Sequence, residues 1–285
     1  MYKVIATGPR AEIEAVWDAL AWADPSPAGA VDAKEDTRTS WRLSAYAETE
    51  EAAQACLDII IGTVPELNAR YEALPERDWV AMSLEGLPPV EAGPFFVAGE
   101  HAIKIASPGQ ISIMIEAGPA FGTGHHGTTL GCLLAYAETL RYRRPGKVLD
   151  LGTGSGVLAI AALKTAATRA IGTDIDADSV RTALQNARDN HVLANFKAYT
   201  CAGTHQQNVR AAAPYNTIFA NILARPLVKL APEIASVAAP GANIILSGLL
   251  RHQEPQVRGA FDGRGFHLKT RVHRDGWSTL LYSKA

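Results

Sequence analysis

The sequence predicts an α/β protein with a doubly wound, mostly parallel sheet, preceded by a smaller α+β domain. From residue 147 onward, apolar strand-like runs alternate with segments of helical periodicity, which is typical of βα units. A glycine-rich turn joins the first of those strands to its helix. Residues 1 to 64 instead follow the order β-α-β-β-α, which indicates a ferredoxin-like unit whose last short strand is not evident.

The elements of the first domain follow from their residue patterns. Residues 2 to 7 form a β-like run, and the apolar residues of 9 to 23 lie on one helical face. Residues 41 to 46 alternate like a half-buried strand, and residues 48 to 61 return to helical spacing. These elements carry no cluster of acid, base and nucleophile. We therefore expect residues 1 to 64 to be a recognition domain.

The next two segments lead into a second domain, residues 80 to 285. Residues 65 to 79 are polar, charged and helix-capable, and Pro75 ends the pattern, so we expect a linker helix. Residues 95 to 97 and 103 to 115 alternate between apolar and polar side chains. This pattern favours a β-hairpin at the start of the second domain.

Residues 147 to 176 are the most informative stretch of the chain. Gly152, Gly154 and Gly156 alternate through the turn after the first strand. Asp174 falls 22 residues after Gly152, at the end of the next strand. Glycines this close let a ligand approach main-chain N–H groups where no Cβ intrudes, and an acid at the second strand end can bind a ribose diol. The stretch predicts a site for a nucleoside-bearing cofactor.

The spacing of the glycines selects between cofactors. Nicotinamide and flavin sites need G-x-G-x-x-G, and here Val157 occupies the third glycine position. The pattern Asp150-x-Gly152-x-Gly154-x-Gly156 instead resembles motif I of the class I S-adenosylmethionine-dependent methyltransferases. That resemblance implies a Rossmann-like seven-stranded sheet whose glycine turn receives the methionine part of S-adenosylmethionine.

A second glycine-rich stretch, residues 120 to 129, precedes an apolar helix. Thr128 or Thr129 is available to cap that helix, whose free N–H groups suit a carboxylate such as that of a methionine moiety. His125 and His126 lie in the same stretch. No third ligand has the spacing of a metal site, so we expect no metal.

Further alternation of strands and helices completes the second domain. Residues 201 to 208 lack the carboxylate that many class I methyltransferases place near the adenine, so backbone or hydroxyl groups would contact the base. A buried-type strand ends at Asn221, and residues 241 to 250 form the next one. Asp275 and Gly276 mark a closing hairpin. An antiparallel pair at this end is the plan of the class I methyltransferase sheet.

Composition and charge restrict the function further. The chain has 285 residues, 47% of them hydrophobic, and three single cysteines, so we expect a cytoplasmic globular protein without a structural zinc site. No apolar run reaches the roughly 18 residues of a membrane span. Residues 1 to 74 hold six Lys and Arg against thirteen Asp and Glu, whereas the remainder holds 21 against 16. The acidic first part argues against nucleic-acid binding, and it either suits a basic protein partner or serves solubility alone.

Three stretches together carry a closer resemblance: AFGTGHHGTT at 120 to 129, DLGTGSG at 150 to 156 and NILARPL at 221 to 227. As a set they resemble the ribosomal protein L11 methyltransferase family (PrmA), as do LSGLL at 246 to 250 and EGLPPVEAGPFFV at 85 to 97. The resemblance covers the whole length and implies that the N-terminal domain recognises the substrate. It also implies methyl transfer from S-adenosylmethionine to lysine side chains and the N-terminal amine of ribosomal protein L11.

Carried over residue by residue, the resemblance implies that Thr129, Gly152, Asp174 and Asn221 hold the cofactor, and the glycine pattern adds Gly154. For catalysis, we expect the side-chain carbonyl of Asn221 to accept hydrogen bonds from the incoming amine and to aim its lone pair. No dedicated base is required, since an apolar, cation-bearing site lowers a lysine pKa from about 10.4.

Two further features concern the loop before the apolar helix. We expect Phe121 to form an apolar wall of the site. The family's loop often has proline where this chain has Gly127, which leaves the loop more flexible.

Three alternatives remain open: a lysine methyltransferase of a different basic protein, a nicotinamide-dependent oxidoreductase, and a non-catalytic binding module. We expect a monomer that binds ribosomal protein L11 and neither nucleic acid nor membrane.

Overall fold

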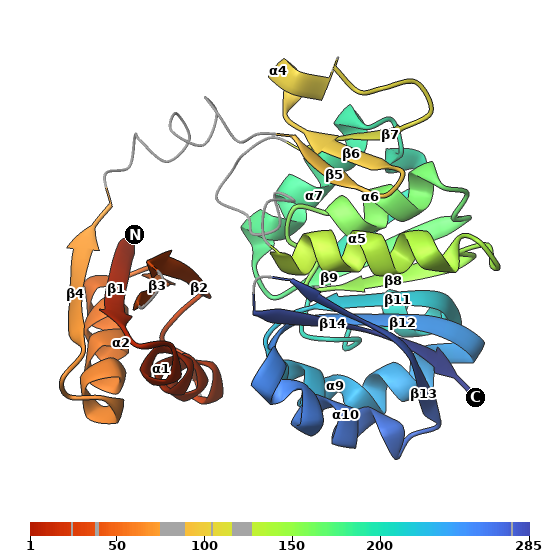
Figure 1. The fold of residues 1–285 in the computed structure, drawn as a ribbon. Helices are drawn as coiled ribbons and strands as arrows, with labels where there is room; N and C mark the ends of the chain where they lie inside the picture. Colours follow the sequence, from red (N-terminus) through yellow and green to blue (C-terminus); the bar gives the residue numbers. More distant parts are fainter. Residues whose placement is uncertain (24, 38–39, 75–88, 104, 116–126, 275) are drawn as a thin grey trace. The chain divides into compact units, whose positions relative to one another are not determined.

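The computed structural model describes residues 1–285 except 24, 38–39, 75–88, 104, 116–126 and 275 (Figure 1). The chain divides into two compact units, Met1–Met82 and Ser83–Ala285. Each unit has its own buried side chains. The first is built around residues such as Trp17 and Leu43, and the second around the two faces of a large sheet.

The N-terminal unit is a four-stranded antiparallel sheet with two helices packed against it (Figure 1). Its sheet order, β2-β3-β1-β4, is that of a ferredoxin-like unit. Thr49 caps the second helix by accepting a hydrogen bond from the N–H of Ala52 at 3.2 Å. The elements are β1 (Tyr2–Gly8), α1 (Arg10–Trp22), β2 (Ala30–Thr37), β3 (Ser40–Ala47), α2 (Glu50–Thr63) and β4 (Asn68–Ala73).

The segment predicted as a linker helix contains β4, so that prediction is wrong for residues 68–73. β4 pairs antiparallel with β1, and Tyr71 points toward α2, where its hydroxyl donates to Glu50 at 3.2 Å. The charged residues that resembled a helical surface lie instead on the exposed positions of an edge strand. β4 is also the strand that the N-terminal pattern left unassigned. Residues 75–79 lie outside the described residues.

The second unit contains a seven-stranded sheet of order β10-β9-β8-β11-β12-β14-β13. Neighbouring strands from β10 to β12 run parallel, whereas β14 is antiparallel to β12 and β13. The strands are β8 (Lys147–Leu151), β9 (Arg169–Asp174), β10 (Phe196–Thr200), β11 (Tyr215–Asn221), β12 (Ala238–Leu250), β13 (Phe266–Arg274) and β14 (Trp277–Lys284). The mostly parallel sheet and the closing hairpin are confirmed.

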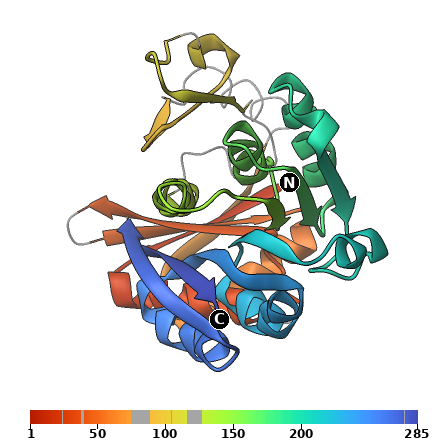
Figure 2. The same ribbon diagram turned by 90° about the vertical axis from the view of Figure 1, so that its right-hand side faces the viewer.

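Two helical layers cover this sheet (Figures 1 and 2). One layer holds α5 (Gly127–Thr139), α6 (Val157–Lys164) and α7 (Ala177–Asp189), and the other holds α8 (Gln207–Ala211), α9 (Ala224–Val237) and α10 (Glu254–Asp262). The central strand β8 is buried on both faces, with Val148 in one apolar cluster and Leu149 in the other. Burial on both faces explains the continuous apolar runs of the central strands.

A three-stranded sheet comes before the large one and consists of β5 (Val90–Ala92), β6 (Phe95–Ala98) and β7 (Ile111–Met114). β5 and β6 form an antiparallel hairpin, but β7 runs parallel to β6. The predicted hairpin between residues 95–97 and 103–115 is therefore wrong. The short helix α4 (Glu100–Ile103) lies between β6 and β7, so the chain goes back to the starting end of β6 before β7 begins.

Helix α5 approaches β14 so closely that Gly131 has no room for a side chain. A Cβ at Gly131 would overlap the hydroxyl of Thr279, which is buried and β-branched. Gly259 in α10 is a useful contrast, because no atom of the described residues lies within contact distance of a Cβ placed there.

We predict opposite effects of alanine at these two helical glycines. Gly259→Ala should raise the free energy of unfolding by about 0.5–1 kcal/mol, because alanine loses less backbone entropy in a helix. Gly131→Ala should lower it by about 1–3 kcal/mol through overpacking against Thr279. Urea unfolding followed by circular dichroism measures both changes. Stabilisation of both variants would contradict the close approach of α5 to β14.

Candidate active site

The residues predicted to hold a cofactor meet at one edge of the seven-stranded sheet. β8, β9 and β11 are parallel, so their carboxyl ends share that edge. Gly152 and Gly154 follow β8, and Asp174 ends β9. Asn221 ends β11, and Thr129 lies in the first turn of α5. β9 and β11 lie on opposite sides of β8, and ligands of doubly wound sheets bind at such a switch point.

The glycine turn after β8 is shaped by close packing on both sides. Gly152, Gly154 and Gly156 have φ angles of 67°, 51° and 80°, a region that favours glycine. A Cβ at Gly152 would overlap the side chain of Ile222, which follows β11. A Cβ at Gly156 would lie 3.1 Å from the Cβ of Ala183 in α7. Main chain without side chains therefore forms this part of the site.

Asp174 connects the glycine turn to the end of β9. Its Oδ2 accepts a hydrogen bond from the N–H of Gly154 at 2.9 Å, and its Oδ1 accepts one from the N–H of Asp176 at 3.1 Å. Burial raises the pKa of the Asp174 carboxyl, and these two hydrogen bonds oppose the shift. The next residue, Ile175, is 80% exposed. The sequence pattern gave no sign of this exposure, because isoleucine is ordinarily buried.

Asn221 and Thr129 meet although 92 positions separate them in the sequence. The Nδ2 of Asn221 donates to the Oγ1 of Thr129 at 3.4 Å, and Thr129 is fully buried. The Oδ1 of Asn221 is also buried and has no hydrogen-bond partner among the described residues. An unpaired buried acceptor costs free energy, which makes the Oδ1 of Asn221 a candidate to accept a hydrogen bond from a ligand.

Asp150 is a second buried acid, behind the glycine turn. Its Oδ2 accepts hydrogen bonds from the Thr153 hydroxyl at 2.8 Å and from the N–H of Ala159 in α6 at 3.3 Å. Its Oδ1 has no partner in the described part of the chain. Burial raises the pKa of Asp150 to about 7, and the hydrogen bonds from Thr153 and Ala159 oppose that shift. Asp150 holds the turn against α6 and changes its charge near neutral pH.

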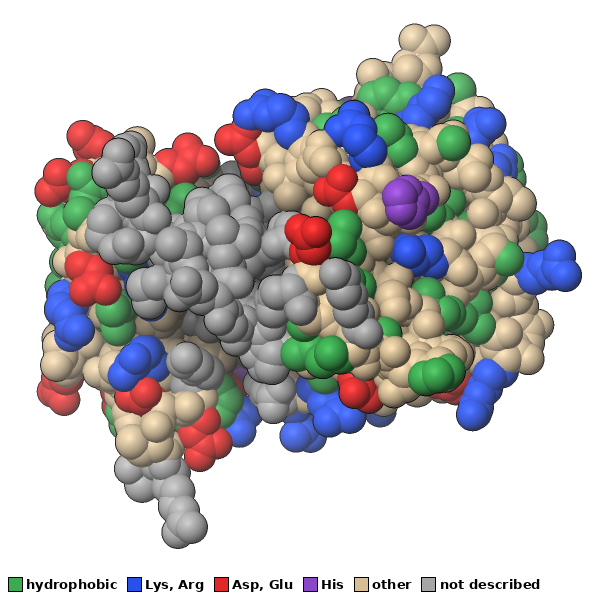
Figure 3. Space-filling model, turned by 90° about the horizontal axis from the view of Figure 1, so that it is seen from above, with side chains coloured by type: hydrophobic (Ala, Val, Ile, Leu, Met, Phe, Trp, Pro, Cys, Tyr) green, Lys and Arg blue, Asp and Glu red, His purple; other side chains and the backbone are tan. Residues whose placement is uncertain are grey.

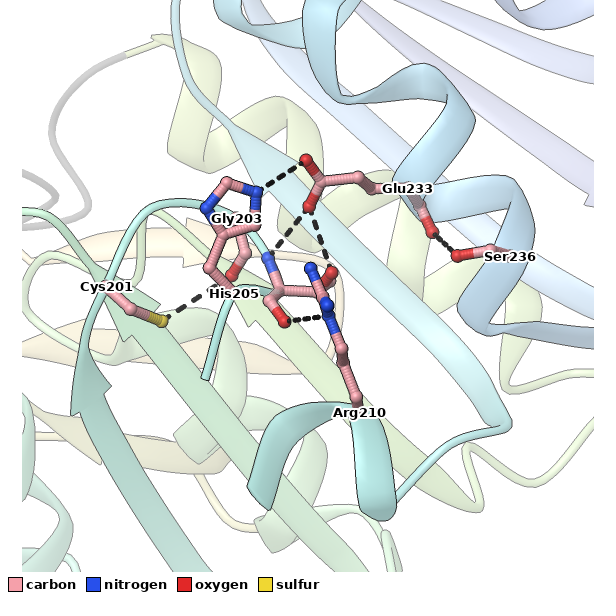
Figure 4. A network of polar contacts seen from close by, with 7 residues as sticks. Cys201, Gly203, His205, Arg210, Glu233 and Ser236 are labelled. Atoms are coloured by element: carbon pink, nitrogen blue, oxygen red, sulfur yellow. Dashed lines mark hydrogen bonds and ion pairs between the residues drawn. The ribbon is translucent and has the colours of Figure 1, made fainter. Parts of the chain in front are cut away.

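The loop after β10 is anchored from two sides. The N–H of Cys201 donates to the main-chain carbonyl of Asp174 at 2.8 Å. Glu233 of α9 accepts hydrogen bonds from the N–H and hydroxyl of Thr204 at 3.1 and 2.9 Å (Figure 4). Arg210 of α8 donates to the Thr204 carbonyl at 2.9 Å. The loop lacks a carboxylate, as its sequence shows, and the carboxylate that fixes it comes from a distant helix.

The loop before α5 is only partly described. Phe121, His125 and His126 lie outside the described residues, so the predictions made for their roles stay predictions. Gly127 is the first residue of α5. Across the described ranges, no helix is long and apolar enough to cross a membrane.

The strand order, the reversed β14, the glycine turn and the acid at the end of β9 define a class I S-adenosylmethionine-dependent methyltransferase. Comparison with known proteins then identifies the family within that class.

The family model for ribosomal protein L11 methyltransferase (PrmA) matches residues 18–285. The ribosomal protein L11 methyltransferase of Caulobacter sp. strain K31 is 44% identical over 285 residues, which cover 99% of this chain and 97% of that protein. The protein of the same name from Mesorhizobium japonicum is 48% identical over 224 residues, covering 78% and 77%.

A crystal structure of ribosomal protein L11 methylase from Lactobacillus delbrueckii subsp. bulgaricus is similar as well. It is 28% identical with a TM-score of 0.61, and the match covers 69% of this chain and 98% of that one. The chain belongs to the ribosomal protein L11 methyltransferase family. Membership decides against the nicotinamide-dependent oxidoreductase and the non-catalytic binding module.

The raised pKa of Asp150 predicts a specific dependence of stability on pH. Its ordinary value is 3.8, and the folded value is about 7. Between these values the folded protein keeps a proton that the unfolded chain has lost, so the contribution of Asp150 to stability falls as pH rises. Asp150→Asn has no such proton. Its free energy of unfolding relative to wild type should therefore rise by roughly 2–3 kcal/mol from pH 5 to pH 8.

Urea unfolding at several pH values measures this difference. Thr153→Val is the matched variant, because it removes a hydrogen bond that lowers the Asp150 pKa and should move the window to higher pH. Parallel stability curves for wild type and Asp150→Asn would show that Asp150 is ionised in the folded protein throughout.

Proposed function

We propose that this enzyme transfers methyl groups from S-adenosylmethionine to lysine side chains and the N-terminal amine of ribosomal protein L11. The observation that carries the proposal is the Oδ1 of Asn221, which is buried beside Thr129 at the switch point of the sheet and has no hydrogen-bond partner among the described residues. An incoming amine brings the N–H donor that this acceptor lacks. The shared name of the relatives, ribosomal protein L11 methyltransferase, supports the choice of target.

The residues at this edge fit the cofactor. Gly152 and Gly154 leave main chain open to its methionine part, and Thr129 lies in the first turn of α5, whose N–H groups suit a carboxylate. Asp174 can accept hydrogen bonds from ribose hydroxyls, and the exposed Ile175 beside it offers an apolar surface to the adenine. S-adenosylmethionine supplies an electrophilic methyl group on a sulfonium.

Asn221 is the residue that aligns the amine. A lysine amine has an ordinary pKa of about 10.4 and must lose its proton before it can attack. An apolar site that already bears a cation lowers that pKa, so no dedicated base is required. The Oδ1 of Asn221 then accepts a hydrogen bond from the neutral amine and directs its lone pair. Alignment of this kind can supply up to about 7–11 kcal/mol of a barrier.

Substrate recognition is assigned to the N-terminal unit. On the face shown in Figure 3, acidic and basic side chains occur over both units, and acidic ones predominate over the N-terminal unit. The acidic excess of residues 1 to 74 suits a basic protein and opposes a phosphate backbone. We also propose that the enzyme is a cytoplasmic monomer that does not bind nucleic acid.

We predict that Asp174→Ala weakens the binding of S-adenosylmethionine about tenfold or more, because the hydrogen bonds to the ribose are lost. Asp176→Ala is the matched control two residues away. Its side chain caps α7 by accepting from Ser179 and from the N–H of Asp178, so the variant should lose about 1 kcal/mol of stability and keep its cofactor affinity. Titration calorimetry measures both affinities. Unaltered binding in Asp174→Ala would leave that residue with a structural role only, through its hydrogen bonds from the N–H groups of Gly154 and Asp176.

Methyl transfer itself is tested with free, unmodified ribosomal protein L11 and methyl-labelled S-adenosylmethionine, followed by intact-mass analysis. We expect mass gains in steps of one methylene. Absence of any gain, with cofactor binding shown separately, would reassign the substrate to another basic protein.

Asn221→Ala should lower kcat about tenfold or more, since the acceptor that aligns the amine is removed. Asn216→Ala is the control at the opposite end of β11, where the side chain accepts from the N–H of Lys147 at 3.0 Å. That variant should lose stability and keep its kcat. Full turnover by Asn221→Ala with unchanged cofactor affinity would contradict the proposed role of Asn221.

A further inference from the structure

The LSGLL segment at the end of β12 forms an irregularity beside the candidate site. The pairing of β12 with β14 shifts in register between Leu246 and Leu249, so Ser247 and Gly248 form a bulge. Gly248 has a φ of 84°, and a Cβ there would overlap the main-chain carbonyl of Ile222. The N–H of Ile222 donates to the Ser247 carbonyl at 3.1 Å. The end of β11 therefore packs on this bulge and is hydrogen-bonded to it.

The Ser247 side chain connects the bulge to β14. Ser247 is fully buried, and its hydroxyl bonds the Thr279 hydroxyl at 2.8 Å and the Ser278 carbonyl at 3.2 Å. Thr279 is 1% exposed, so the hydroxyl pair is shielded from water. The pair fixes the orientation of the Thr279 side chain on the face that α5 covers.

Thr279 in turn supports the first turns of α5. Gly131 packs directly on the Thr279 side chain, with no room for a Cβ between them. Gly131 lies two residues after Thr129, whose hydroxyl accepts the hydrogen bond from Asn221 at 3.4 Å. Asn221 pairs with Ser247 across the β11–β12 register. These contacts link Asn221 through Ser247, Thr279 and Gly131 to Thr129, which is itself hydrogen-bonded to Asn221.

We propose that the hydroxyl pair of Ser247 and Thr279 is a positioning device for Asn221 and Thr129. The inference rests on the proposed function, because it assigns Asn221 and Thr129 to the methyl-transfer site. The hydroxyl pair acts through the packing of α5 and β11. The pair sets the distance between α5 and the end of β11, and that distance decides where the Oδ1 of Asn221 lies. The LSGLL segment thereby acquires a role in positioning the site residues.

A purely structural hydroxyl pair would affect stability alone, so the test compares two buried threonines with the same substitution. Thr279→Val removes one hydroxyl of the pair and keeps the side-chain volume. Thr217→Val is the matched control: Thr217 is buried on β11, at the end remote from Asn221, and its hydroxyl donates to the Pro145 carbonyl at 3.0 Å. Both variants should lower the melting temperature by roughly 2–4 °C.

The two variants should differ in cofactor binding. By titration calorimetry, Thr279→Val should bind S-adenosylhomocysteine about five- to tenfold more weakly, the ratio expected for one displaced hydrogen bond, whereas Thr217→Val should bind like wild type. Thr279→Ser keeps the hydroxyl and should restore the affinity. In the Asn221→Ala background, Thr279→Val should have a smaller effect on binding than in the wild type, because one of the two residues that it positions is gone.

Hydrogen exchange of the ligand-free protein gives a second readout. Amides of residues 127–133 should exchange faster in Thr279→Val than in Thr217→Val. Equal affinity, equal exchange and equal loss of stability in the two valine variants would overturn the positioning role. Methylation of ribosomal protein L11 by wild type is measured in parallel, so a wrong substrate shows as absent transfer while the binding and exchange comparisons still decide the inference.

Discussion

The chain segments that follow β8 and β11 can lie side by side only because Gly152, the residue after β8, has no side chain. Ile222 packs on the bare main chain of Gly152, and on its other side the Ile222 carbonyl packs against Gly248 of β12. A Cβ at either glycine would force these strand ends apart, and a close-packed interior has no slack to absorb such a shift. Because Asn221 immediately precedes Ile222, both approaches fix the amide relative to the glycine turn. The geometry of the candidate site therefore depends on glycine at positions 152 and 248.

The second constraint is electrostatic. Asp150 is buried with one oxygen unpartnered among the described residues, and Asn221 keeps an amide oxygen in the same condition. Burial that raises the pKa of Asp150 to about 7 reflects a real free-energy cost of holding a carboxyl away from water. A fold selected for stability alone would pair or remove such groups. Under the proposed function, a ligand supplies the donor that the Asn221 oxygen lacks among the described residues.

Most of the fold was predictable because periodicity reports burial directly. The central strands read as apolar runs, the helices repeat their apolar residues every three to four positions, and the glycine turn follows the spacing of methyltransferase motif I. The errors came from segments whose conformation depends on partners. β4 has an edge-strand composition that is equally suited to a helix, and it becomes a strand because β1 offers a free edge. β7 runs parallel to β6 because the short helix α4 turns the chain between them, which strand alternation alone does not reveal.

From the sequence alone came the cofactor class, the resemblance to the family and the candidate site residues, because the glycine turn and the stretches that carry the resemblance are local features of the chain. The tertiary structure decided how those residues are held. The contact of Thr129 with Asn221, the support of Gly131 by Thr279 and the capture of Thr204 by Glu233 each join positions far apart in the chain. Such contacts depend on strand order and on distances of a few ångströms between packed elements. No local pattern encodes them, since each arises only when the sheet has brought its carboxyl ends to a common edge.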